Sequence, residues 1–189
     1  MNERRAYTAG KLQTREENED RYIEGYFAVF CQETEIWNGW YEQIAIGAFA
    51  NSLKNNDIRC LFNHDSGFVL GRKSAGTLEL REDSYGLFGK VKINASDRQA
   101  MDVYARVERG DISGCSFGFM PAAEEYEEKE DGTHWIVKEA DTSEVSIVTF
   151  PAYPQTEIQA RKKDAEQNRK NRVERQKAEL KKRLEEIKC

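Results

Sequence analysis

The feature that most constrains the fold is a series of short apolar segments separated by polar turns. These segments cover residues 22–30, 40–46, 58–63, 75–81, 87–93, 113–120 and, in two pieces, 135–150. Their β-branched and aromatic composition is typical of strands. Within this part of the chain, helices are expected only over residues 48–54 and from about residue 96 to Gly110, so strands and helices do not alternate as they do in parallel α/β folds. The sequence therefore predicts about seven strands in a mainly antiparallel sheet or barrel, with peripheral helices.

Charge and composition divide the chain into unequal parts. The 189 residues carry a formal net charge of -5, but residues 1–160 carry -11 and residues 161–189 carry +6. Residues 158–189 also contain no glycine, proline or aromatic residue. We therefore expect a flexible N-terminal arm over residues 1–20, a folded body over residues 21–157, and a basic helical tail over residues 158–189.

The tail contains four apolar residues at heptad-like spacing, namely Val173, Leu180, Leu184 and Ile187. Lysines occupy two positions at which the repeat requires apolar side chains, and this weakens the pattern. The tail is then either a solvated single helix or a coiled coil that self-associates or binds a partner.

The overall composition argues against several classes of protein. An acidic body does not suit a nucleic-acid-binding domain, because neutralisation of phosphates supplies most of such affinity. No apolar segment approaches the ~20 residues that span a bilayer, and the amino terminus is too polar for a signal peptide. The four cysteines have neither CxxC spacing nor a histidine at a zinc-like interval. The sequence therefore predicts a protein without a membrane span, a nucleic-acid partner or a cysteine-based zinc site.

Histidine is scarce, and this limits the candidates for a general base. Only His64 and His134 occur, and imidazole is the side chain that titrates nearest to neutral pH. His64 ends an apolar strand and opens a loop, where a rigid scaffold commonly presents reactive groups. His134 follows an acidic turn and is expected to be an exposed hairpin residue. His64 is the candidate base, although a lone histidine is more often structural.

The segment over residues 113–119 contains the candidate nucleophile. Successive side chains of a strand point to opposite faces, so Cys115 and the two phenylalanines that follow it are expected to face the core. Ser116 then lies on the other face between two glycines, where a substrate backbone could approach closely. The alternative is a glycine-rich edge strand with an incidental serine. The same alternation ranks Cys115 below Ser116 as the nucleophile that would pair with His64.

Residues 141–148 supply a candidate carboxylate. If Val145 and Ile147 face the core, Glu144 lies on the opposite face of the strand. A carboxylate in that position could hold an imidazole in the required tautomer and stabilise the imidazolium. The alternative is an ordinary solvent-facing acid.

Taken in order, these segments resemble the prohead (capsid maturation) serine proteases of tailed phages, whose fold is similar to that of herpesvirus assemblin. The resemblance covers roughly residues 20–155 and includes GYFAVF (25–30), GAF (47–49), LFNHD (61–65), LG (70–71), SFGF (116–119), EVSIV (144–148) and PA (151–152). It implies an antiparallel β-barrel of the assemblin type, here followed by a charged C-terminal helix. It also implies a serine endopeptidase, without cofactor, that cuts the major capsid protein precursor, scaffold segments and itself. The expected location is the host cytoplasm, inside the immature capsid.

The resemblance also assigns roles to individual residues. It maps the nucleophile onto Ser116 and the base onto His64. Assemblin uses a second histidine as its third member, but His134 does not lie in the matching strand. We therefore carry the third role to Glu144, with Asp141 as the main competitor. Residues 149–156 contain no arginine, so nothing is transferred for the oxyanion site.

A non-catalytic interpretation competes with the protease. In it, the chain is a β-barrel assembly or scaffolding module whose coiled-coil tail organises a larger shell. The two hypotheses differ in whether a serine-directed phosphonate labels one residue and whether purified protein shortens on storage. An esterase-like hydrolase has no support, because the G-x-S-x-G residues 114–118 lie within a predicted strand and form no elbow between a strand and a helix.

Overall fold

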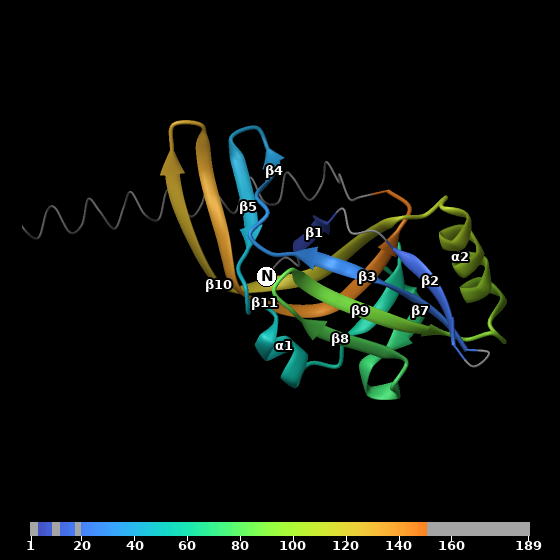
Figure 1. Cartoon of the computed structure of the whole chain (residues 1–189). Coiled ribbons are helices and arrows are strands. Elements are labelled where there is room, and N and C mark those ends of the chain that lie inside the picture. Colours follow the sequence, from blue (N-terminus) through green and yellow to red (C-terminus); the bar gives the residue numbers. More distant parts are fainter. Residues whose placement is uncertain (1–3, 9–11, 18–19, 151–189) are drawn as a thin grey trace, which may run out of the picture. The chain divides into compact units, whose positions relative to one another are not determined.

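The computed structural model describes residues 4–8, 12–17 and 20–150, and Figure 1 shows the arrangement of their elements. In chain order the elements are β1 (Arg4–Thr8), β2 (Gln13–Glu17), β3 (Asp20–Val29), β4 (Thr34–Trp37), β5 (Trp40–Ile44), α1 (Ala50–Asn55), β6 (Arg59–Phe62), β7 (Asp65–Arg72), the 3-10 helix η1 (Lys73–Ala75), β8 (Leu78–Glu82), β9 (Gly86–Ile93), α2 (Arg98–Arg109), β10 (Gly114–Lys129) and β11 (Gly132–Val148). The predicted tail, and with it the choice between a single helix and a coiled coil, lies outside the described residues.

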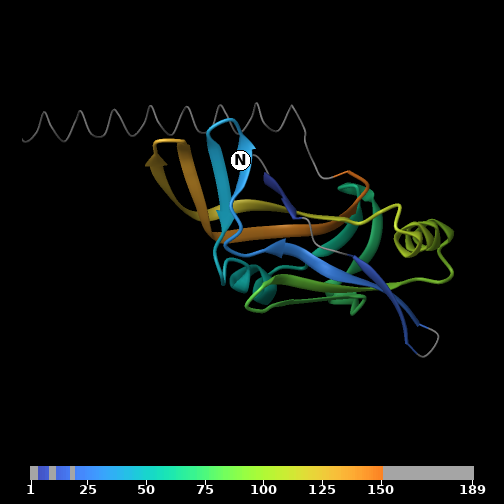
Figure 2. The same ribbon diagram turned by 45° about the horizontal axis from the view of Figure 1, so that its top comes forward.

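The strands form two sheets, which Figures 1 and 2 show from different sides. One sheet has four antiparallel strands in the order β2-β3-β9-β8. The other has seven strands in the order β1-β10-β11-β5-β4, with β6 paired to β11 and β7 paired to β6. The predicted mainly β body with few helices is confirmed. No strand pairing among the residues described above closes the sheets into one barrel, so the assemblin-type barrel stays a prediction.

The larger sheet is mixed: most of its described strand pairs are antiparallel, as predicted, but two are parallel. Strand β11 is 17 residues long and has room for two partners along one edge. Its first part, Thr133–Val137, pairs in parallel with β5, and its last part, Glu144–Ile147, pairs in parallel with β6. Its opposite edge pairs with β10 in antiparallel fashion. The long strand thus brings β6 and β10 to either side of Glu144.

One hydrophobic core combines side chains from both sheets and from the helices. Phe117 is fully buried in this core, with its ring centroid 5.1 Å from that of Phe49 and 5.1 Å from that of Phe119. Cys115, Phe117 and Phe119 are all fully buried. The predicted core-facing side of this strand is therefore confirmed, and Ser116 lies on its other side.

Helix α2 follows the predicted segment closely. It ends at Gly110, which has a φ of +87° that favours glycine, as predicted from the sequence. Its N-cap is Asp97, one residue later than the predicted Ser96, and the Asp97 side chain accepts hydrogen bonds from the backbone N–H groups of Gln99 and Ala100. Such a cap satisfies amide groups that the helix itself leaves without partners.

Two predicted irregular segments are strands in the structure. In place of a loose arm over residues 1–20, β1 pairs with β10 and β2 pairs with β3. In place of a loop over residues 124–132, β10 continues to Lys129 and pairs with β11 across a short turn. Polar strands of this kind have no apolar face to reveal them in the sequence. Hydrogen bonds to a neighbouring strand, which are not local in sequence, supply their order.

Candidate active site

His64 lies in a two-residue turn between β6 and β7. Phe62 pairs with Asp65 across this turn, and both turn residues, Asn63 and His64, have a positive φ, of 52° and 60° respectively. Positive φ at both central positions is the geometry of a type I′ hairpin, which usually selects glycine or asparagine. The left-handed conformation costs a residue with a side chain roughly 1–2 kcal/mol. Such strain persists where the surrounding structure enforces it, and it is commonly found at functional sites.

Asn63 joins this turn to the end of β11. Its backbone N–H donates to the carbonyl oxygen of Ile147 at 2.9 Å. Its side-chain oxygen accepts a hydrogen bond from the backbone N–H of Thr149 at 2.8 Å. Because these bonds fix the residue before His64, the direction of the imidazole is set by the sheet.

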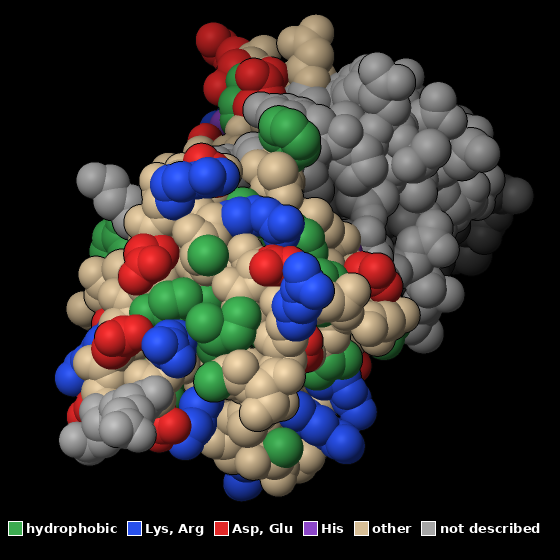
Figure 3. Space-filling model, turned by 90° about the vertical axis from the view of Figure 1, so that its right-hand side faces the viewer, with side chains coloured by type: hydrophobic (Ala, Val, Ile, Leu, Met, Phe, Trp, Pro, Cys, Tyr) green, Lys and Arg blue, Asp and Glu red, His purple; other side chains and the backbone are tan. Residues whose placement is uncertain are grey.

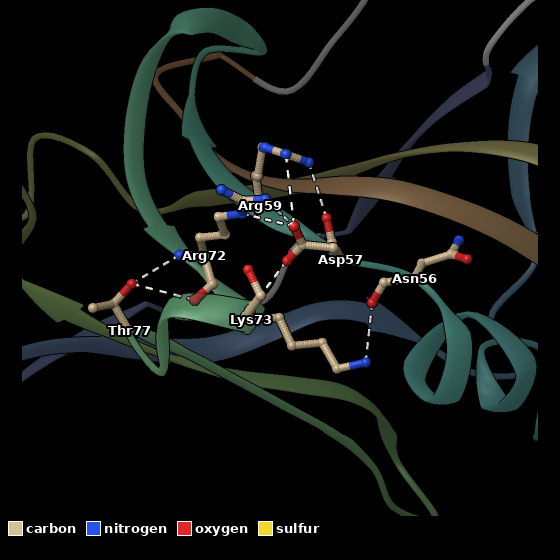
Figure 4. Close-up of polar contacts among 7 residues, drawn as sticks. Asn56, Asp57, Arg59, Arg72, Lys73 and Thr77 are labelled. Atoms are coloured by element: carbon tan, nitrogen blue, oxygen red, sulfur yellow. Dashed lines mark hydrogen bonds and ion pairs between the residues drawn. The ribbon is translucent and has the colours of Figure 1, made fainter.

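An ion-pair network holds the other end of the β6–β7 hairpin (Figure 4). The Arg72 guanidinium donates from Nε to Asp57 Oδ2 at 2.7 Å, and Ser74 N–H donates to Asp57 Oδ1 at 3.0 Å. The Arg72 guanidinium holds the pKa of the Asp57 carboxyl well below its usual range. Lys73 Nζ donates to the carbonyl oxygen of Asn56 at 3.0 Å, next to the end of α1. The hairpin is thus anchored at both ends.

The structure brings His64 and Glu144 into direct contact. Nδ1 of His64 lies 2.6 Å from Oε1 of Glu144, and each side chain is 8% exposed. A carboxylate can only accept, so it favours the tautomer in which Nδ1 carries the proton and Nε2 has a lone pair. Nε2 is buried and makes no hydrogen bond within the part of the chain that the structure describes. The nitrogen that a general base would use is therefore not committed to a structural contact.

Ser116 lies on the same face of the sheet as Glu144. It is directly opposite Ser146 in the β10–β11 pairing, and Ser146 is beside Leu61 in the β11–β6 pairing. Two strand spacings separate β10 from β6, which is about 10 Å between backbones. The side chains of Ser116 and His64 do not form a hydrogen bond in this structure, because Nε2 has no such partner. Contacts between a nucleophile and its base are often loose in the absence of substrate.

The face that carries Ser116 is not open, contrary to the prediction from its flanking glycines. Ser116 is fully buried. A Cβ added at Gly114 would lie 2.8 Å from the carbonyl oxygen of Val148, so this glycine is required by the close approach of β11. Packing of the neighbouring backbone, rather than clearance for a substrate, explains the absence of a side chain at this position.

Neither competitor for the third role contacts His64 in the structure. Asp141 is exposed and accepts a hydrogen bond from Asn56 Nδ2 at 2.7 Å. His134 pairs with Glu127 near the tip of the β10–β11 hairpin, roughly 40 Å along the strand from Ser146 at the usual rise per residue. The prediction that His134 is exposed is wrong, since it is 3% exposed and lies between two carboxylates.

The two thiols near the site are unsuited to nucleophilic chemistry. Cys60 and Cys115 are completely buried. Burial raises the pKa of the Cys60 thiol and that of the Cys115 thiol far above the usual value. Because the thiolate is the reactive form, neither is activated in this environment. This agrees with the ranking of Cys115 below Ser116.

Metal, membrane and nucleic-acid binding each depend on particular groupings of side chains. Residues 4–8, 12–17 and 20–150 contain no group of three or more His, Cys, Asp or Glu side chains arranged to hold a metal ion. No helix in those ranges is long and apolar enough to cross a membrane. On the face shown in Figure 3, the described basic and acidic side chains are interspersed and the hydrophobic ones form small groups. This mixture differs from the one-signed basic patch typical of nucleic-acid-binding surfaces.

Comparison with known proteins connects this geometry to a family. The model of the caudovirus prohead serine protease family matches residues 10–171. The prohead protease of Enterobacteria phage HK97 is 32% identical over 144 residues, which are 74% of this chain but only 60% of that relative. The solved structure of the bacteriophage T4 capsid assembly protease matches with a TM-score of 0.55 at 14% identity, over 79% of this chain and 98% of that chain, and thus shares its fold. The extent of the family match and the identity to the HK97 protein place this chain in the caudovirus prohead serine protease family.

Proposed function

We propose that this chain is a serine endopeptidase that cleaves capsid-protein and scaffold segments, and itself, while a phage shell assembles. The observation that carries the proposal is the contact of His64 Nδ1 with Glu144 at 2.6 Å, which leaves Nε2 uncommitted. Ser116 lies on the same face of the sheet, one strand away from Glu144. Family membership supports the proposal independently.

In the proposed reaction, Ser116 attacks the carbonyl carbon of a peptide bond. Nε2 of His64 takes the proton from the Ser116 hydroxyl and then donates it to the departing amine. Glu144 holds the imidazole in orientation and stabilises its charged form. Water then hydrolyses the acyl-enzyme by the same route in reverse. Because Ser116 is fully buried here, substrate binding has to uncover its hydroxyl.

The relatives are named for the prohead and for capsid assembly, which supports the major capsid protein precursor and scaffold segments as substrates, cut inside the immature capsid in the host cytoplasm. An assemblin-type barrel followed by a charged helix belongs to the same proposal.

The basic tail would bind scaffold or capsid, or link protease molecules. Deletion of residues 161–189 is expected to lower incorporation into proheads, and unchanged incorporation would rule this role out.

The proposal is tested by incubating the full chain with the neighbouring capsid precursor and identifying products by mass spectrometry. Ser116→Ala and His64→Ala are each expected to abolish cleavage, and the melting temperature of each variant should stay close to that of the wild type. A serine-directed phosphonate should label Ser116 alone. Ser66→Ala is the matched control, because Ser66 is exposed in the hairpin that carries His64. Continued processing by the Ser116→Ala variant would show that the nucleophile is assigned wrongly.

The burial of Ser116 favours a second candidate function, the non-catalytic assembly or scaffolding module. A nucleophile with no exposed surface cannot meet substrate without a rearrangement. If the wild-type chain enters proheads but yields no cleavage products and takes no phosphonate label, this candidate replaces the protease.

A further inference from the structure

We propose that Ser146 is a positioning residue that holds the Glu144 carboxylate in the orientation needed to align His64. This inference rests on the proposed function, because it concerns the same site. It adds a residue to the site that neither strand alternation nor the family resemblance assigned a role.

The contact itself is direct. Ser146 Oγ donates a hydrogen bond to Glu144 Oε2 at 2.6 Å, while Glu144 Oε1 faces His64 Nδ1, also at 2.6 Å. The two carboxylate oxygens thus have different partners: Ser146 on β11 and His64 in the turn between β6 and β7. Ser146 is fully buried and Glu144 is 6% exposed, so bulk water does not readily replace either partner.

The strand geometry explains why Ser146 can make this contact. Residues two apart in a strand point to the same face, so Ser146 and Glu144 both project from β11 on the side of His64. Ser146 is directly opposite Ser116 on β10 and beside Leu61 on β6. It therefore lies in the middle strand, between the proposed nucleophile and the strand that leads to the proposed base.

Two-point attachment has a consequence that a single contact would not have. A carboxylate bonded through one oxygen can rotate about its terminal bond, and the terminal torsion of glutamate is broad. A second bond to the other oxygen fixes that rotation, so Oε1 stays directed at Nδ1. Hydrogen bonds to a charged acceptor are also stronger than those between neutral groups. We therefore expect loss of the Ser146 hydroxyl to weaken alignment of His64 rather than binding of substrate.

The experiment compares Ser146→Ala, Ser146→Thr and Ser146→Val in the full chain. Thr and Val have similar shapes and differ in the hydroxyl. Removal of the hydroxyl is expected to lower kcat by about 10-fold or more, with KM nearly unchanged, because the lost interaction orients the base. Ser146→Thr should retain most of the activity that Ser146→Val loses. The downfield Nδ1–H resonance of His64, identified by its loss in His64→Gln, should shift in the Ala and Val variants.

Ser52→Ala is the control for the loss of a buried hydroxyl. Ser52 is also buried, accepts a hydrogen bond from Thr142 N–H at 2.9 Å and donates to the carbonyl oxygen of Ala140. These bonds do not involve His64 or Glu144. Ser52→Ala is expected to lower the melting temperature without moving the His64 resonance or kcat, which separates a structural effect from positioning.

The outcomes distinguish this inference from the proposed function. If wild type cleaves substrate and Ser146→Ala matches it in kcat and in the His64 resonance, Ser146 has no positioning role and the protease assignment stands. If wild type does not cleave, the proposed function fails, and the His64 resonance alone still decides whether Ser146 orients the pair. If Ser146→Ala does not fold, equal kcat in Ser146→Thr and Ser146→Val would overturn the inference.

Discussion

His64 and His134 each place Nδ1 2.6 Å from a glutamate oxygen, which belongs to Glu144 in the first case and to Glu33 in the second. The two sites differ at the other ring nitrogen. Nε2 of His134 lies 2.9 Å from Asp131 Oδ1, whereas Nε2 of His64 has no hydrogen-bond partner in the described ranges. A ring with a carboxylate at each nitrogen is stabilised as a cation. A ring with a single carboxylate can still accept a proton, so the second contact separates a structural histidine from a candidate base.

The surroundings of His134 support a structural role. Its ring stacks on Tyr41 of β5 at a centroid distance of 4.5 Å and an interplanar angle of 11°. Hydrogen bonds with Glu33 and Asp131 raise the pKa of His134. Glu33 precedes β4, and Asp131 lies in the turn between β10 and β11. His134 thus joins two neighbouring hairpins far from Ser116.

The largest effect is expected when each of the two histidines is replaced in turn. His64→Gln should lower kcat by about 10⁶-fold, as expected for loss of a general base that acts together with a nucleophile. His134→Gln should leave kcat nearly unchanged and lower only the stability of the hairpins. Steady-state cleavage of a capsid-precursor peptide measures both. Similar losses of kcat in the two variants would contradict the assignment of His64 as the base and His134 as a structural residue.

The next effect concerns the carboxylate partners. Glu144→Gln should lower kcat by about 10⁴-fold, less than His64→Gln, because the third member orients the base and does not itself react. Glu33→Gln is the matched control, with the same contact distance to the other histidine, and should retain activity. A Glu144→Gln protein that fails to fold would instead favour a purely structural pair, and circular dichroism detects that outcome.

A smaller effect is expected from a substitution on the core-facing side of β10, opposite to the face that carries Ser116. Cys115→Ala should leave kcat unchanged and lower the free energy of unfolding by about 1 kcal/mol, because it removes a buried group of small volume from the core. Urea denaturation and the cleavage assay together measure the two quantities. Loss of cleavage at full stability would mean that the thiol, rather than the Ser116 hydroxyl, takes part in the reaction.

The smallest effect is a pH dependence of stability that comes from His134. The hydrogen bonds with Glu33 and Asp131 raise its pKa in the folded protein above the ordinary histidine value of about 6.5, so its stabilising contribution is complete below pH ~6.5. That contribution is lost as the pH rises through the folded-state pKa. The free energy of unfolding, measured in urea from pH 6 upward, should therefore fall more in wild type than in His134→Gln. Parallel curves for the two proteins would contradict a stabilising role for the contacts of His134 with Glu33 and Asp131.

The candidate site shows which kinds of information are local in a sequence. Alternation along residues 113–119 correctly separated Ser116 from Cys115, because the two-residue period of a strand is a local property. The scarcity of histidine limited the base to two residues. The polar residues that follow Phe62 predict the start of a loop, although an asparagine after an apolar strand also favours positive φ. The structure instead has a two-residue turn that leads into strand β7.

Local patterns are enough to predict the mainly β character of the body, the core-facing side of β10 and a short list of reactive residues, because hydrophobic period and residue type depend on a few neighbouring positions. Packing of distant segments is what places Glu144, rather than Asp141 or His134, against His64, and Ser146 against Glu144. The contact between His64 and Glu144 joins residues 80 positions apart. It depends on the register of β11 against β6, which no short segment of the sequence encodes.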